Sequence, residues 1–259
     1  GNQVLNTNQL AAGHSNIIEA KSSVAFGASN MVETGSDYAF ASGFGTTVKA
    51  TATAGHTEGY QTTSSGSYSH AEGKGTLAEG ATSHAEGLYS TARGDGSHAE
   101  GGATFAIGQA SHAEGQLTRA IGAESHAEGF RTKAEGLASH AEGRNTTASG
   151  NYSHAEGLET DSLGDYSHAE GYYTVASGAA SHAEGAYTTA SGETAHAEGF
   201  FTYAFGLGTH AEGAYTTASG YYAHSEGHKT HADSTAAHAE GFKTKAFAGA
   251  SHAEGYETT

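Results

Sequence analysis

Residues 111–129 read SHAEGQLTRAIGAESHAEG, and the five letters SHAEG open and close this stretch with a spacing of 14 residues. The spacing extends well beyond it, because a histidine recurs every 14 residues from His56 to His252, at fifteen positions without a slip. A glutamate follows each of these histidines by two residues, and a glycine comes directly after it. Such self-similarity at a fixed period is typical of a repeat architecture.

A second pattern, T-x-A-x-G, occupies the other half of each period, as in TFAIG at 104–108 and TTASG at 188–192. It has the same frame as SHAEG: a hydroxyl residue, a variable residue, alanine, a variable residue and glycine. The 14-residue unit is therefore made of two halves of seven residues. Only the first half fills its variable positions with histidine and glutamate throughout.

The alternation of residue types predicts short strands, because successive side chains of a strand point to opposite faces. Ser111 and Ala113 then share one face, and His112 and Glu114 share the other. Glycine after each short strand permits the positive φ that a tight corner needs. We predict an all-β, parallel β-roll or solenoid with 14-residue coils, two short strands per coil and a coil spacing of about 4.8 Å. A helix is disfavoured, since each regular glycine would cost about 1 kcal/mol relative to alanine.

Composition excludes several classes of protein. The chain has 259 residues with 39 glycines, no cysteine and no proline, and its formal net charge is −17. The acidic balance argues against binding to nucleic acid or to an anionic membrane face. Without cysteine there is neither a disulfide framework nor a thiolate metal site. The chain stops in mid-repeat at SHAEGYETT, so we expect the repeat to continue past the C-terminus.

Two regions are expected. Residues 1–55 contain more hydrophobic coils of irregular register, and residues 56–259 contain the regular SHAEG repeat. The spacing between Tyr38 and His56 is 18 rather than 14, which predicts a longer coil or loop near Phe44 to Ala54.

The uniform histidines and glutamates indicate a restrictive environment. The equivalent positions of the second half vary freely, as Lys133, Asp161 and Phe247 show, which is what a solvated face tolerates. Of the 20 tyrosines and phenylalanines after His56, 15 lie at three positions that flank the SHAEG strand. An aromatic rim around a uniform strip suggests protein–protein contact. The small Ser, Thr and Ala face lines a thin core that buries little area, at about 25 cal/mol per Å².

The simplest arrangement is a closed homotrimer with the histidine and glutamate strips facing inward. The predicted interface ladder consists of His56, Glu58, His70, Glu72, His84, Glu86, His98, Glu100, His112, Glu114, His126, Glu128, His140, Glu142, His154, Glu156, His168, Glu170, His182, Glu184, His196, Glu198, His210, Glu212, His224, Glu226, His238, Glu240, His252 and Glu254.

Catalysis is not expected, because Ser111 and His112 are strand neighbours on opposite faces and cannot act as nucleophile and base. Metal binding is the stronger alternative, since histidines of adjacent coils and of three chains could hold Zn, Ni or Cu. The favoured interpretation needs no metal or cofactor: each imidazole donates to a neighbouring carboxylate. These pairs would raise the histidine pKa and lower the glutamate pKa, which predicts greatest stability at mildly acidic pH. His228 and His231 fall outside the period and are interpreted as surface residues.

The segment SSVAFGASNMVETGSDYAFASG at 22–43 carries a resemblance. SVAFG, with a 14-residue echo in DYAFA, resembles the repeat of YadA-like head domains in trimeric autotransporter adhesins. The SHAEG form of the frame resembles repeat regions of phage tail-fibre and appendage proteins. The resemblance implies a left-handed, homotrimeric β-roll. This chain departs from the family pattern, because Val24 and Phe26 of an apolar strip are replaced by histidine and glutamate in all later coils.

These observations predict a non-enzymatic adhesive fibre segment, extracellular on a cell surface or in a virion tail fibre, that attaches to a host or another surface. Its expected partners are two further copies of the chain and a host receptor of unknown identity, without nucleic acid or membrane contact. The alternative is a metal- or small-ligand-binding solenoid that uses the histidine and glutamate ladder.

Overall fold

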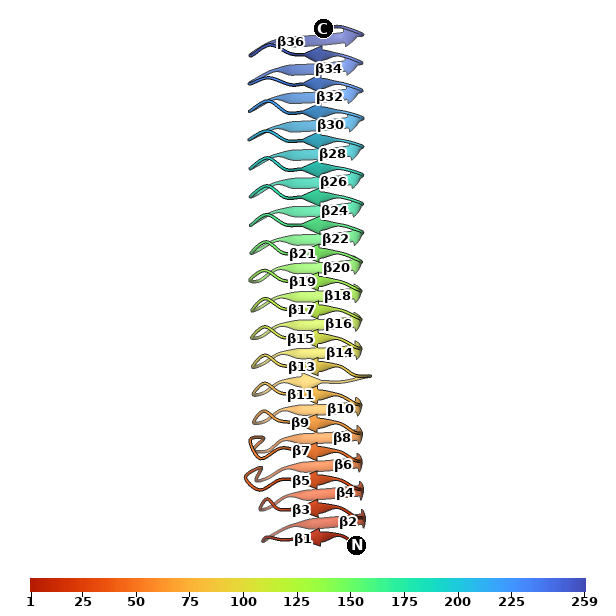
Figure 1. Cartoon of the computed structure of the whole chain (residues 1–259), viewed down its shortest axis with the longest axis vertical. Coiled ribbons are helices and arrows are strands. Elements are labelled where there is room, and N and C mark those ends of the chain that lie inside the picture. The colour runs from red at the N-terminus through yellow and green to blue at the C-terminus, as the bar shows by residue number, and fades with distance from the viewer. The chain divides into compact units, whose positions relative to one another are not determined.

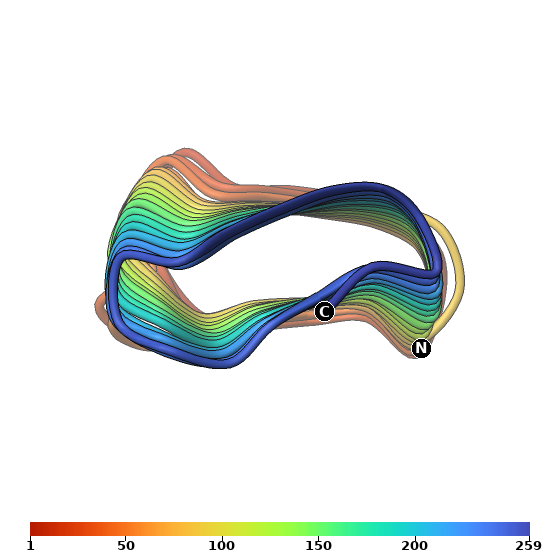
Figure 2. The ribbon, with the colours of Figure 1, turned by 90° about the horizontal axis from the view of Figure 1, so that it is seen from above.

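The computed structural model describes residues 1–259, which form two compact units, Gly1–Arg131 and Thr132–Thr259. Every regular element is a β-strand, and no helix is long and apolar enough to cross a membrane. Within each unit the chain winds into stacked coils, and each coil supplies two strands, which differ in length except at β12 and β13 (Figure 1). Seen along the stack, most coils of each unit follow the same flattened path (Figure 2).

The longer strands begin at the histidine of SHAEG or its equivalent. In the first unit they are β2 (Leu10–His14), β4 (Val24–Ala28), β6 (Phe40–Phe44), β8 (His56–Tyr60), β10 (His70–Lys74), β12 (His84–Ala85), β14 (His98–Gly102), β16 (His112–Gln116) and β18 (His126–Phe130). In the second unit they are β20 (His140–Arg144), β22 (His154–Leu158), β24 (His168–Tyr172), β26 (His182–Ala186), β28 (His196–Phe200), β30 (His210–Ala214), β32 (His224–His228), β34 (His238–Phe242) and β36 (His252–Tyr256).

The T-x-A-x-G half supplies strands of two residues. In the first unit they are β1 (Gln3–Val4), β3 (Ile17–Ile18), β5 (Met31–Val32), β7 (Thr47–Val48), β9 (Thr63–Ser64), β11 (Leu77–Ala78), β13 (Thr91–Ala92), β15 (Phe105–Ala106) and β17 (Arg119–Ala120). In the second unit they are β19 (Lys133–Ala134), β21 (Thr147–Ala148), β23 (Asp161–Ser162), β25 (Val175–Ala176), β27 (Thr189–Ala190), β29 (Tyr203–Ala204), β31 (Thr217–Ala218), β33 (His231–Ala232) and β35 (Lys245–Ala246).

Strands pair in parallel with the same strand of the next coil, so identical residues lie in register. His112 pairs with His126 and Glu114 with Glu128, each 14 residues on. On the opposite side of a coil, Thr189 pairs with Tyr203 in the same way. The predicted all-β parallel solenoid with 14-residue coils and two strands per coil is therefore confirmed.

The register of the first coils differs from the sequence prediction. Val24 pairs with Phe40, and Phe40 pairs with His56, so two successive coils contain 16 residues. The segment that pairs with SVAFG is therefore AFASG at 39–43. The prediction that DYAFA is the equivalent segment, 14 residues on, was wrong. The extra residues lie in the turns after β5 and β7, so the longer loop is not confined to Phe44 to Ala54.

The core is a column of small side chains, as predicted. Ala113 and Ala120 are fully buried, and so are their equivalents in nearly every coil. Ser111 is also buried, and its Oγ donates a hydrogen bond to the carbonyl oxygen of Gly108 at 2.7 Å. Larger buried side chains occur only in the N-terminal coils, where Ile18, Val32 and Val48 pack with alanines.

The corners are built differently from the prediction. Gly115 has a positive φ of 103°, yet it lies inside strand β16. The left-handed residues at the corners are Leu117 and Glu124, with φ of 61° and 58°, and the equivalent residues of other coils behave alike. Glycine is required at 115 because a Cβ there would collide with the carbonyl oxygen of Gly129 in the next coil.

Candidate functional site

The thirty predicted ladder residues form a continuous strip within each unit, called the His/Glu strip below. Each longer strand from β8 to β36 begins with the histidine and continues with an inward-pointing residue, usually alanine. In a strand this order places histidine and glutamate together on the outer face. In-register pairing then stacks each residue on its copy in the neighbouring coil.

The imidazole rings form a stacked column. His154 and His140 stack with ring centroids 4.8 Å apart and planes 1° apart, and His182 and His196 repeat this geometry. The column begins at His56, whose ring packs edge-on against Phe40 at 4.8 Å. About a third of most of the histidine side chains remains exposed in the single chain.

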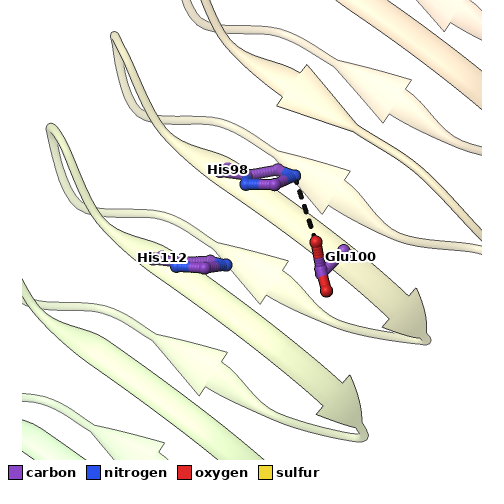
Figure 3. A group of neighbouring side chains, drawn as sticks. All are labelled: His98, Glu100 and His112. Atoms are coloured by element: carbon purple, nitrogen blue, oxygen red, sulfur yellow. Dashed lines mark ion pairs between the residues drawn. The ribbon is translucent and has the colours of Figure 1, made fainter.

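Each histidine lies within ion-pair distance of the glutamate of its own strand. Figure 3 shows His98 and Glu100 beside His112 of the next coil. The Nε2 atom of His98 lies 3.6 Å from the Oε2 atom of Glu100. The separation falls to hydrogen-bond length at His168 and Glu170, at 3.2 Å. A bonded ladder was expected, but most pairs are longer than a good hydrogen bond. At His98 and His112, Nε2 is shielded from solvent and has no hydrogen-bond partner.

The expected rise in histidine pKa is wrong where the shift is resolved. Burial, together with the neighbouring His56 and His84, lowers the pKa of His70 to about 4. The pKa of each of His154, His196 and His224 is lowered for the same reasons, burial first and adjacent histidines second. The strip glutamates act in the opposite direction but do not offset burial. The imidazoles of these coils are therefore held neutral.

The strip also brings together groups that could ligate a cation. In His98, Glu100 and His112, one ligand atom from each residue lies within 4.8 Å of the others. The same arrangement occurs at His112, Glu114 and His126 and again at His196, Glu198 and His210. Imidazole nitrogen with carboxylate oxygen is a donor set suited to Zn²⁺ and related transition metals.

Aromatic residues flank the strip at the coil corners. In the second unit Tyr173, Tyr187, Phe201 and Tyr215 form a stacked ladder, with successive centroids 4.6–5.4 Å apart. The opposite corner carries Tyr152 and Tyr166, stacked at 5.2 Å. All these rings are partly or largely exposed. The sequence indicated these positions, but not that the rings stack on one another.

The serine that precedes a strip histidine does not share its face. Ser111 points into the roll and bonds to Gly108, whereas His112 lies on the outer face, as predicted. A serine–histidine hydrogen bond of the kind that acyl transfer requires is therefore ruled out for this pair.

The sequence matches the family described as YadA head domain repeat in five segments, residues 71–97, 85–111, 136–159, 169–195 and 197–223. A comparison with curated proteins gave no match. The matched segments fall in both units and contain the SHAEG strand in each case. The YadA head family is a structural adhesin domain. The parallel coils and their 14-residue period agree with this similarity to YadA head repeats.

Proposed function

We propose that this chain is a rigid, non-enzymatic segment of an extracellular adhesive fibre, in which three copies close around their His/Glu strips. The observation that carries the proposal is the strip itself. It is uniform over fifteen coils, half-buried already in one chain, and flanked by exposed aromatic rings. The solvated face of the short strands shows no such uniformity.

The core gives a second reason for a closed oligomer. Alanine, serine and threonine fill almost all of the buried positions, so each coil removes little apolar surface from water. Repeat proteins draw their stability from the interfaces between neighbouring units. An inward-facing strip adds a large interface that runs along the stack.

The family supports the biological role. YadA head repeats are surface-exposed adhesin modules that form trimers. We infer a left-handed trimeric roll that displays its short-strand face outward, on a cell surface or in a virion tail fibre, for attachment to a host or another surface. Its function is mechanical, because backbone ladders running along the stack hold each coil on the previous one.

Sedimentation equilibrium tests the proposal. The chain is expected to sediment as a trimer, and the double variant His154→Asp, His168→Asp is expected to dissociate because it adds unpaired charge to the buried contact. The matched control places the same charges in adjacent coils of the opposite face, as Thr63→Asp and Leu77→Asp, and is expected to remain trimeric. A stable monomer for the unmodified chain, or equal dissociation of both variants, would overturn the inward-facing strip.

A second candidate function, metal binding along the strip, is supported by the groups at His98, Glu100 and His112. Elemental analysis after dialysis against Zn²⁺, with and without a chelator, tests it. Retention of metal in stoichiometric amounts, reduced in the variant His98→Gln, His112→Gln while the groups of other coils still bind, would support a metal-binding strip. Metal content at the level of a blank would reject it.

A further inference from the structure

A hollow of about 640 Å³ lies on the second unit, and no residue of the His/Glu strip lines it. Its walls are two columns of side chains from five successive coils, one column at the corner after the longer strand and one on the short strands. The lining residues are Phe201, Tyr203, Tyr215, Thr217, Lys229, His231, Lys243, Lys245, Glu257 and Thr259. This volume is within the range of sites that hold small molecules or segments of a polymer.

The hollow runs along the stack of coils. Tyr203, Thr217, His231 and Lys245 occupy the same position of strands β29, β31, β33 and β35. At a coil spacing of about 4.8 Å, five coils extend over roughly 19 Å. The result is an open groove that crosses the strands at right angles, and it offers side chains rather than free backbone groups to a ligand.

One end of the groove is aromatic. The rings of Phe201 and Tyr215 stack at 5.4 Å, and Tyr203 stacks on Phe205 at 5.7 Å. Thr217 follows Tyr203 in the same column and is much smaller, which leaves the groove open beside the rings. Exposed aromatic surface of this kind packs against the apolar faces of sugar rings as well as against other rings.

The other end is basic. Lys229, Lys243 and Lys245 are all exposed and all line the groove. They are three of the seven lysines in a chain whose net charge is −17. The Lys229 ammonium lies 5.9 Å from the centre of the Tyr215 ring, and Lys243 pairs with Glu257 at 2.8 Å. The lysines therefore concentrate positive charge in one groove of an acidic protein.

We propose that this groove binds a linear acidic polysaccharide, a glycan chain bearing carboxylate or sulfate groups. The lysines pair with the anionic groups, and the aromatic end packs against a sugar ring. The groove is long, straight and shallow, and it repeats with the coils, which fits an extended polymer. A peptide strand could not add to a sheet here, because the strands run across the groove and their backbone groups are paired with adjacent coils. The acidic remainder of the chain disfavours nucleic acid.

The proposal is tested by measuring the affinity of the whole chain for heparin, a sulfated uronate polysaccharide. Neutral dextran and single-stranded DNA serve as comparison ligands. We expect saturable heparin binding that weakens with added salt, and no dextran binding. The variant Lys229→Ser, Lys243→Ser, Lys245→Ser should weaken it about tenfold, since each exposed ion pair contributes little alone. The matched control Lys21→Ser, Lys74→Ser, Lys133→Ser removes the same charge elsewhere and should bind as the unmodified chain does.

The variant Tyr203→Ala separates the aromatic contribution from charge: it should weaken heparin binding while leaving the salt dependence unchanged. Equal losses in the two triple lysine variants, or DNA binding as tight as heparin binding, would overturn the proposal. Because the groove lies outside the His/Glu strip, sedimentation of the same samples shows separately whether the trimer is intact. Loss of the trimer with retained heparin binding would refute the proposed assembly and not this site.

Discussion

The imidazole rings of His70 and His84 stack face to face, with centroids 4.7 Å apart and planes 3° apart. His56 covers the other face of the His70 ring at 4.3 Å. Glu72 on the same strand and Glu86 on the next coil are the carboxylates around this stack. Burial and the two neighbouring imidazoles outweigh the attraction of Glu86, so the pKa of His70 falls to about 4. Stacking at this spacing therefore favours neutral rings.

This relationship predicts that acid destabilises the fold. The pKa of His70 is about 4 when folded and about 6.5 when unfolded, and those of His154, His196 and His224 are also lowered. A lowered histidine pKa contributes stability that is fully present above the unfolded pKa and is lost as pH falls below it. The melting temperature should therefore be level above about pH 7 and drop by several degrees on going to pH 5.

Circular dichroism melts between pH 8 and pH 4 check this, with the variant His70→Gln, His154→Gln, His196→Gln, His224→Gln as control. The variant loses four of the titrating rings, so its acid sensitivity should shrink. A melting temperature that rises between pH 7 and pH 5 would contradict neutral stacking and favour the paired, charged ladder that the sequence suggested.

The sequence predicted which residues of each strand point inward and which point outward, but it did not predict the direction of the histidine pKa shifts. Alternation alone places Ser111 and Ala113 inside and His112 outside, because a strand has a side-chain period of two. The pKa direction was missed because the pattern shows glutamate beside histidine but not the burial of Nε2 or the stacking of one imidazole on the next. Those depend on the rotamers that the spacing of coils imposes.

The repeat pattern also did not predict the register of the first coils or the backbone conformation at the corners. Two residues are added to each of the turns that precede Phe40 and His56, and turns carry no periodic side chain that would reveal an insertion. Leu117 and Glu124 adopt left-handed backbone although neither is glycine. Their conformation follows from closing a short coil, so no residue preference at these positions could have indicated it.

Glycines between coils should tolerate no side chain. A Cβ on Gly164 would collide with the carbonyl group of Gly178 in the next coil, although Gly164 itself has no positive φ. Gly164→Ala should lower the free energy of unfolding by about 1–3 kcal/mol, the usual cost of overpacking. Gly249→Ala is the matched control, because the nearest atom to its Cβ is 3.8 Å away. Urea titration of both variants measures the difference, and an unchanged midpoint for Gly164→Ala would show that the coils can separate to admit a methyl group.

Buried threonine hydroxyls differ in how much they contribute to the stability of the fold. Thr104 is fully buried and its Oγ1 has no hydrogen-bond partner, whereas the Oγ1 of Thr76 donates to the carbonyl oxygen of Glu72 at 3.0 Å. Valine has nearly the same shape as threonine. Thr104→Val should therefore be neutral or stabilising, and Thr76→Val should cost about 1 kcal/mol, the net value of one hydrogen bond. Thermal melts compare the two, and equal losses would mean that the Thr104 hydroxyl is bonded in solution.

Deletions should be tolerated by whole periods only. Removal of residues 168–181 joins Ser167 to His182 and keeps every histidine in register, so His154 would pair with His182 as it now pairs with His168. Removal of residues 175–181 instead brings His182 to the position of Val175, where a five-residue strand must take the place of one of two residues. The first variant should keep a single cooperative melt near that of the unmodified chain, since stability in repeat proteins is a sum over neighbouring units. The second should melt lower and be cleaved by chymotrypsin at Tyr172 or Tyr173, beside the junction. Equal melting of the two variants would mean that the halves of a coil are interchangeable, in which case the His/Glu strip would not require one continuous face.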